Sequence, residues 1–304
     1  MFRLRNDTVI ISSIDNLDLA NKIGNRLDIQ VLQPNLQIFS DGESKIQLDS
    51  VSSKKCIIIQ STHSPVDEHL MQLFMIIHKC NTDRAENICV ISPYMGYSRQ
   101  DKEFIKGEVI TIELIGKILE TIGTNRLVTI DIHNPNVLTK FHFKADNISA
   151  IPLLAQYVLS YLKLDNPLVI SPDTGGITRA KQLASILKTD MLSLIKTRDK
   201  YTGNVTTRYE GTTPLYDRDA ILIDDIISTG HSIINAVKIL KQLGCKNVFV
   251  LCTHALLLEN AAQKLLTIGV NDIIATNSVP NPFAKVDLSS ILSQHISTFI
   301  TVSS

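Results

Sequence analysis

The sequence lacks the features that mark membrane, secreted and nucleic-acid-binding proteins. No segment approaches the roughly 18 unbroken apolar residues of a membrane span. The N-terminus is a poor signal peptide, because its short apolar run ends in polar residues. Lys plus Arg and Asp plus Glu number 30 each, so no charge excess favours nucleic acid or a membrane surface. We therefore expect a cytoplasmic protein that binds neither.

Cysteine is also scarce. The five cysteines are odd in number, scattered along the chain and without a CxxC pair. We expect reduced, mostly buried residues that behave as small hydrophobes, and we do not expect a zinc site. These residues are Cys56, Cys80, Cys89, Cys245 and Cys252.

What the sequence does contain is a regular alternation of short apolar runs with helical patterns over 304 residues. The runs are nearly continuous in Val, Ile and Leu, which is typical of strands buried on both faces of a sheet. Helices with one apolar face are predicted over Asp67–Lys79 and Ser232–Leu243. The expected strands are Thr8–Ile11, Lys55–Gln60, Asn87–Ser92, Leu127–Ile132, Pro167–Ser171, Ala220–Ile223, Val248–Thr253 and Asp272–Thr276.

This alternation predicts an α/β fold with mainly parallel sheets and right-handed crossovers. The strands fall into two groups, so we expect two domains, residues 1–145 and 146–304. No low-complexity linker separates the two groups, and expected strands and helices alternate in the same way in both halves of the chain.

The stretch LIDDIISTGHSII, residues 222–234, places two carboxylates where a buried strand is expected to end. Ligands bind at the carboxyl ends of strands in open parallel sheets. Residues 226–232 are expected to form a loop that leads into a helix N-terminus, where N–H groups and hydroxyls can hold an anion. Asp224 and Asp225 would repel a phosphate, so they are expected to face sugar hydroxyls or a divalent metal. The alternative is a plain strand end with an aspartate cap.

Two segments of the N-terminal half also carry polar side chains suited to a ligand. FSDGES, residues 39–44, combines a glycine for a tight turn with two carboxylates that could accept bonds from a base or amine. PYMGYSRQDK, residues 93–102, follows an expected buried strand and offers Arg99 and Lys102 to a phosphate. Taken alone, a surface turn explains the first segment and a basic surface loop explains the second.

Together these motifs resemble the ribose-phosphate pyrophosphokinase family. LIDDIISTG looks like the family's phosphoribosyl-pyrophosphate loop, which type I phosphoribosyltransferases share. QSTHSPVDEHLMQL resembles the family's Q-S-T-x-x-P-V-N-x-x-L-M-E-L segment, and FSDGES, PYMGYSRQDKEFIKGE, DIHN, SPDTGGITRA, KTR and ATNS complete the set in the family's order. The resemblance covers about residues 35–285 and is greatest to the short archaeal-type enzymes. It implies two similar phosphoribosyltransferase-like domains.

The resemblance also implies a reaction. The 1-hydroxyl of ribose 5-phosphate would attack the β-phosphorus of ATP, giving 5-phosphoribosyl 1-diphosphate and AMP with Mg²⁺ as cofactor. The N-terminal domain would be the ATP side and the C-terminal domain the ribose 5-phosphate side of a homo-oligomer, a dimer or a hexamer built from dimers. The alternatives are a non-catalytic regulatory homologue, which the catalytic-type residues disfavour, and a phosphoribosyltransferase, which leaves the N-terminal motifs without a purpose.

Site roles follow from the resemblance, residue by residue. Catalysis would fall to Lys196 and Arg198, which a solvated basic loop would otherwise explain. His133 and Asp173 match metal-associated positions, and His133 could instead bond an ATP phosphate. The expected ATP-binding residues are Phe39, Asp41, Glu43, Arg99, Gln100, Asp101 and His133, and the expected ribose 5-phosphate-binding residues are Asp224, Asp225, Ser228, Thr229, Gly230 and Ser232.

The phosphate loop departs from the family pattern at one position. His231 stands where Gly or Ala is usual, and Ser232 replaces a Thr while keeping the hydroxyl. A side chain at residue 231 could crowd the loop, or it could add a titratable group beside the phosphate.

Overall fold

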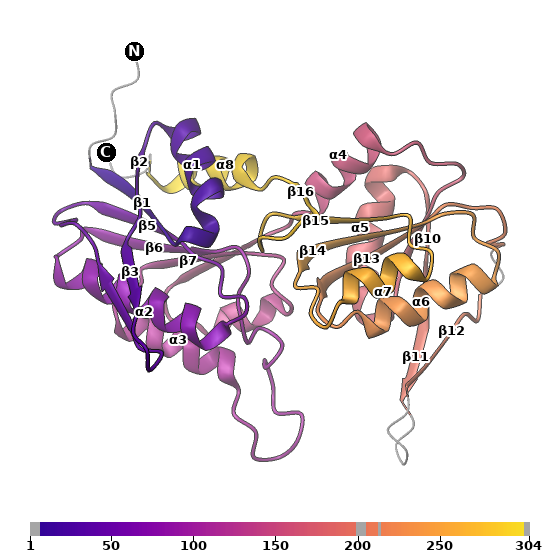
Figure 1. Cartoon of the computed structure of the whole chain (residues 1–304), viewed down its shortest axis with the longest axis horizontal. Coiled ribbons are helices and arrows are strands. Elements are labelled where there is room, and N and C mark those ends of the chain that lie inside the picture. Colours follow the sequence, from indigo (N-terminus) through magenta and orange to yellow (C-terminus); the bar gives the residue numbers. More distant parts are fainter. Residues whose placement is uncertain (1–6, 199–204, 212–213, 301–304) are drawn as a thin grey trace. The chain divides into compact units, whose positions relative to one another are not determined.

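The computed structural model describes residues 7–198, 205–211 and 214–300 (Figure 1). The chain divides into two compact units. Unit 1 contains the described residues of Met1–Ile148, Ser278–Pro280 and Asp287–Ser304, and unit 2 contains those of Ser149–Asn277 and Asn281–Val286.

Unit 1 is built on a six-stranded sheet whose strands pair in the order β2-β1-β5-β6-β7-β8. Every pairing is parallel. The central strands are buried along nearly their whole length, because helices cover both faces of the sheet. The strands are β1 (Thr8–Ser12), β2 (Gln30–Leu32), β5 (Lys55–Ile59), β6 (Asn87–Ser92), β7 (Arg126–Ile130) and β8 (Lys144–Ile148).

The helices of unit 1 lie in two layers. Figure 1 shows α1 (Leu17–Leu27) and α8 (Ser289–Ile300) on one face of the sheet. Helices α2 (Val66–Thr82) and α3 (Thr111–Thr121) lie on the other face. Their apolar sides pack against the buried strand residues to form one core cluster.

Unit 2 repeats the same arrangement. Its six strands pair in the order β10-β9-β13-β14-β15-β16, again all parallel. Counted along the chain within each unit, both sheets therefore have the order 2-1-3-4-5-6. The strands are β9 (Leu168–Ser171), β10 (Asp190–Ser193), β13 (Ala220–Ile227), β14 (Val248–Ala255), β15 (Asp272–Thr276) and β16 (Ala284–Val286).

Helices again cover both faces in unit 2. Figure 1 shows α4 (Ile151–Tyr161) and α5 (Ile177–Leu187) on one side, with α6 (His231–Gln242) and α7 (Ala261–Thr267) on the other. Each unit also carries an antiparallel hairpin outside its main sheet. The hairpin strands are β3 (Asn35–Ile38) with β4 (Ser44–Gln47), and β11 (Ile195–Arg198) with β12 (Val205–Arg208); the short 3-10 helices are η1 (Ile14–Asn16), η2 (Pro135–Lys140) and η3 (Thr174–Gly176).

The α/β class with parallel sheets is confirmed, and each of the eight expected strands is present. All five cysteines are free and buried, as expected. No helix in the described part of the chain is long and apolar enough to cross a membrane.

The division of the chain differs from the expectation at two places. The expected boundary after residue 145 falls inside β8, a short polar edge strand that completes the sheet of unit 1. The C-terminal helix α8 was expected in the second domain but belongs to unit 1, because it packs against α1. Contacts of this segment with unit 1 include the Arg126 guanidinium over the Phe299 ring, 4.5 Å from its centroid.

The core of unit 1 provides a test of these packing assignments. Leu73 on α2 is fully buried in the core cluster, whereas Met71 on the same helix is 56% exposed. Leu73→Ala should lower the free energy of unfolding by about 2–5 kcal/mol, because it leaves a cavity. Met71→Ala should change it by no more than about 0.5 kcal/mol. Urea unfolding of both variants measures this, and equal effects would contradict the assignment.

Candidate active site

The two adjacent aspartates lie inside β13 and not after it. Asp224 pairs with Cys252 of β14, and the parallel register continues to Ile227. The expectation that the strand ends at Ile223 was therefore wrong by four residues. The loop is also shorter than expected and contains only residues 228–230.

A guanidinium faces both carboxylates. Arg179 on α5 places Nη1 3.3 Å from Asp224 Oδ1 and Nη2 3.3 Å from Asp225 Oδ2. The Asp225 side chain is 6% exposed and that of Asp224 is 21% exposed, so Asp224 is the carboxylate that a ligand can reach.

The balance of charge at this pair is incomplete. Burial and the neighbouring charge of Asp225 raise the pKa of Asp224 well above its ordinary value, while Arg179 acts in the opposite direction. Both carboxylates share the Arg179 guanidinium. The site therefore favours partners that relieve negative charge, such as a cation, or that donate hydrogen bonds, such as sugar hydroxyls.

The loop after β13 leads directly into the N-terminus of α6. Gly230 caps this helix with a left-handed φ of 74°, a conformation that glycine adopts without strain. Ser228 and Thr229 precede it, and Ser232 lies in the first helical turn. Backbone N–H groups at such a helix start form an anion-binding site.

The unusual His231 is the first residue of α6. The left-handed position of the loop is occupied by Gly230, so residue 231 does not require glycine. The His231 side chain is exposed, and its Nδ1 lies 2.8 Å from Thr229 Oγ1. The imidazole thus packs against a loop hydroxyl instead of filling the loop.

Asp173 follows the neighbouring strand β9 at the same edge of the sheet. Its side chain accepts a hydrogen bond from the Gly175 N–H at 2.9 Å and caps η3. Its backbone carbonyl accepts bonds from the hydroxyls of Ser171 at 2.6 Å and Ser193 at 3.0 Å. The structure thus fixes Asp173 firmly in place, and its association with a metal stays a prediction.

Lys196 and Arg198 lie two positions apart on β11. Strand pairing sets Lys196 opposite Thr207 and Arg198 opposite Val205. Their side chains, and residues 199–204 of the same expected basic loop, lie outside the described part of the chain. Their catalytic role stays a prediction.

In unit 1, the FSDGES segment forms the turn of the β3–β4 hairpin. The N–H of Phe39 donates to the carbonyl of Glu43 at 2.8 Å, and the N–H of Glu43 donates to Asp41 Oδ1 at 3.1 Å. Gly42 has a φ of 92°, so the expected tight turn is present. The turn leaves Phe39 43% exposed at the surface of the hairpin.

A hydrogen bond joins the segments that follow β6 and β7. Asn134 Nδ2 donates to Asp101 Oδ2 at 2.6 Å, which joins the RQD motif of Arg99 and Gln100 to the segment that carries His133. Strand β7 ends at Ile130 and Asp131 has a left-handed φ of 37°, so His133 lies beyond the strand.

Sequence reasoning missed two residues that organise these segments. Arg179 stands in the SPDTGGITRA segment and Asn134 in DIHN, so both motifs were noted. Only the fold shows that the first faces the β13 aspartates and that the second reaches Asp101.

Comparison with known proteins shows the family to which this chain belongs. Residues 8–123 match the model of the N-terminal domain of ribose phosphate pyrophosphokinase, and residues 166–303 match that of the phosphoribosyl synthetase-associated domain. The ribose-phosphate pyrophosphokinase of Staphylococcus saprophyticus is 36% identical over 273 residues, covering 89% of this chain and 84% of that protein. That of Methanobrevibacter smithii is 33% identical over 290 residues, covering 92% and 97%.

A solved structure agrees over the whole length. The phosphoribosylpyrophosphate synthetase of Mycobacterium smegmatis superposes with a TM-score of 0.88 at 26% identity, covering 98% of this chain and 100% of that chain.

The charge imbalance on β13 predicts a pH-dependent stability. The pKa of Asp224 is higher in the folded state than its ordinary value of 3.8. Its contribution to the stability of the fold is therefore fully present below pH 3.8, and it is lost as the pH rises through the pKa of the folded state. Asp224→Asn keeps the acceptor for the Asp225 N–H but removes the charge. The variant's melting temperature relative to wild type should therefore be higher at pH 7 than at pH 4.

Thermal melts across this pH range, without substrates, measure the difference. Asp217→Asn, at an exposed position of the same unit, is the control. Its melting temperature should differ from that of wild type by the same amount at every pH. If the melting temperature of Asp224→Asn also differed from that of wild type by the same amount at every pH, the proposed effect of the Asp224 charge would be contradicted.

Proposed function

The chain belongs to the ribose-phosphate pyrophosphokinase family, and we propose that it transfers the diphosphoryl group of ATP to the 1-hydroxyl of ribose 5-phosphate. The products are 5-phosphoribosyl 1-diphosphate and AMP. The observation that carries the proposal is the β13 edge of unit 2, where two carboxylates precede an anion-binding helix start. A phosphorylated sugar is the ligand that satisfies both halves of this edge.

In this proposal the sugar lies along the edge of the sheet, with its hydroxyls at the aspartates and its 5-phosphate at the loop before α6. Asp224 and Asp225 accept hydrogen bonds from the ribose hydroxyls, which relieves the excess negative charge beside Arg179. Residues 228–230 and Ser232 hold the 5-phosphate through N–H groups and hydroxyls. The 1-hydroxyl is left free to attack the β-phosphorus of ATP.

ATP would be bound by the motifs of unit 1. Arg99 offers a planar fork to phosphate oxygens, Gln100 contacts the nucleotide beside it, and His133 bonds a phosphate or a metal. Asp101 holds this arrangement together through its bond to Asn134.

The adenine end is assigned to the β3–β4 hairpin. Phe39 offers an exposed ring to the base, with Asp41 and Glu43 beside it. Leu36 and Ile38 on the same hairpin are also exposed. An apolar exposed hairpin is suited to contact a second copy of the chain, so we propose a homo-oligomer whose base site is completed by a neighbouring subunit.

Lys196 and Arg198 are proposed as the catalytic residues. The transferring group carries dispersed negative charge, and the protein contributes mainly positioning and charge stabilisation. In this proposal two cations two residues apart on β11, in the same unit as the ribose site, would provide that charge.

We propose Mg²⁺ as the cofactor, because unit 2 offers the carboxylate oxygens that this ion prefers. Asp173 supplies carboxylate oxygen, the β13 pair has a deficit of positive charge, and His133 is a further proposed ligand. When bound with ATP, the ion would neutralise charge on the phosphate oxygens. The five free cysteines fit a reducing compartment, so we place the reaction in the cytoplasm.

One assay tests this function. Protein mixed with ATP, Mg²⁺ and ribose 5-phosphate should form AMP and 5-phosphoribosyl 1-diphosphate in equal amounts. A folded protein that forms no AMP would refute the proposal. Formation of AMP without the ribose product would indicate hydrolysis instead.

Lys196→Ala tests the catalytic role. Turnover should fall by about 10³-fold, because stabilisation of the transferring group is lost, with little change in the affinity for ribose 5-phosphate. Lys181→Ala, at an exposed position on α5, is the matched control and should retain turnover. Equal losses of turnover and affinity in Lys196→Ala would make it a binding residue.

A further inference from the structure

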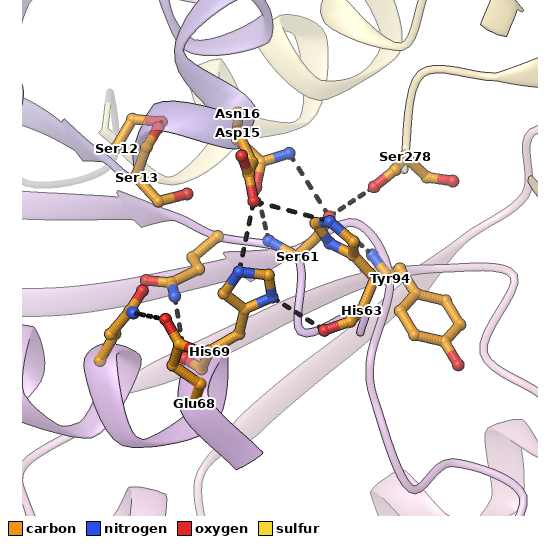
Figure 2. A network of polar contacts seen from close by, with 12 residues as sticks. Ser12, Ser13, Asp15, Asn16, Ser61, His63, Glu68, His69, Tyr94 and Ser278 are labelled. Carbon is orange, nitrogen blue, oxygen red and sulfur yellow. Dashed lines mark hydrogen bonds and ion pairs between the residues drawn. The ribbon is translucent and has the colours of Figure 1, made fainter. Parts of the chain in front are cut away.

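A second cluster of polar side chains lies in unit 1 and belongs to no motif of the proposed reaction. It contains Asp15 in η1, His63 between β5 and α2, and His69 in α2. Figure 2 shows both imidazole rings turned toward the Asp15 carboxylate. In the segment QSTHSPVDEHLMQL, the family pattern noted above specifies neither histidine.

The spacing of these groups suits a small metal ion. The Asp15 Oδ2 atom lies 3.6 Å from His63 Nε2 and 3.3 Å from His69 Nε2. One ligand atom from each of the three residues lies within 4.8 Å of the other two. Ligands of a tetrahedral zinc ion, with bonds of about 2.1 Å, are about 3.4 Å apart.

The orientation of His69 is fixed by a backbone contact. Its Nδ1 lies 2.8 Å from the carbonyl oxygen of His63, and a carbonyl can only accept, so Nδ1 carries the proton. Nε2 of the same ring faces an oxygen of Asp15. Two acceptors at 3.3 Å need a proton or a cation between them. A ring nitrogen oriented by a carbonyl in this way is the usual arrangement of a metal-binding histidine.

His63 enters the cluster from the segment between β5 and α2. The side chain of His63 is 14% exposed, and its ring centroid lies 4.7 Å from that of His69. The two imidazoles are therefore held side by side, with Asp15 next to both of them.

The site is open on one side. Asp15, His69 and Gln60 line a pocket of about 620 Å³ in unit 1. Gln60 is fully buried, and its Nε2 donates to the His69 carbonyl at 2.8 Å. Its Oε1 has no hydrogen-bond partner among the described residues, and it could accept from a water in a fourth metal position.

We propose that Asp15, His63 and His69 bind a divalent transition-metal ion, with Zn²⁺ as the preferred ion. Two imidazole nitrogens and one carboxylate match zinc and its neighbours and do not match Mg²⁺, which prefers oxygen ligands. The lack of paired cysteines, from which no zinc site was expected, does not bear on a site made of imidazoles.

The ion would join segments that are already hydrogen bonded. Asn16, next to Asp15, accepts from the Ser61 N–H at 2.7 Å and donates to the Ser61 hydroxyl at 3.4 Å. The same hydroxyl accepts from the Tyr94 N–H at 3.2 Å. Metal binding would thus tie η1 to the segment after β5 and stabilise unit 1 by mass action.

Titration of the full chain tests the site. Tag-free protein is treated with chelator, placed in excess Mg²⁺ and titrated with Co²⁺ by absorbance and with Zn²⁺ by competition against a chromophoric chelator. We expect one ion per chain, the intense visible spectrum of tetrahedral Co²⁺, displacement of Co²⁺ by Zn²⁺, and a melting temperature raised by a few degrees with Zn²⁺.

Three variants identify the ligands. His63→Ala and Asp15→Asn should each weaken Zn²⁺ binding by more than about 100-fold and abolish the Co²⁺ spectrum. His78→Ala removes an exposed histidine from the same helix as His69 and should leave both unchanged. Asp15→Asn is nearly isosteric at an exposed position, so it keeps the test valid if His63→Ala does not fold.

Two results would overturn the proposal: no binding by wild type in excess Mg²⁺, or binding that Asp15→Asn and His63→Ala leave intact. Zn²⁺ binding and the Co²⁺ spectrum are both independent of AMP formation. The metal site and the proposed reaction are therefore tested separately.

Discussion

Parallel pairing of every strand in both six-stranded sheets brings the carboxyl ends of those strands to one edge of each sheet. The organisation of the candidate site depends on this constraint. In unit 2 it sets the segment after β9 beside β13 and the helix start that follows it. In unit 1 it sets the RQD segment after β6 beside the DIHN segment after β7. Motifs that are far apart in sequence become neighbours because of strand direction alone.

Two adjacent carboxylates at the edge of the unit 2 sheet are electrostatically unfavourable. Two carboxylates on β13 share one guanidinium, and burial together with the charge of Asp225 raises the pKa of Asp224. A structure selected for stability alone would place a second cation there or remove an acid. Unit 2 keeps the imbalance, and a ligand that donates hydrogen bonds or brings a cation relieves it.

Sequence patterns predicted the buried part of this fold well. The central strands are nearly continuous in Val, Ile and Leu, and this pattern can be recognised from the sequence alone. Edge strands such as β2 and β8 are short and partly polar, so no periodicity marks them. The length of β13 was underestimated because charged residues normally end a buried strand, whereas Arg179 permits this one to continue. The roles of Asn134 and of the Asp15 cluster depend on contacts between segments, which no local pattern encodes.

The repeated strand order also relates one aspartate of unit 1 to one aspartate of unit 2. The first strand of unit 1, β1, leads into η1 with Asp15, and the first strand of unit 2, β9, leads through Asp173 into η3. Both acids therefore occupy the corresponding turn of two copies of one architecture. The first turn therefore carries a carboxylate in both units, but in different surroundings: Asp15 lies beside two imidazoles in unit 1, and Asp173 caps η3 in unit 2.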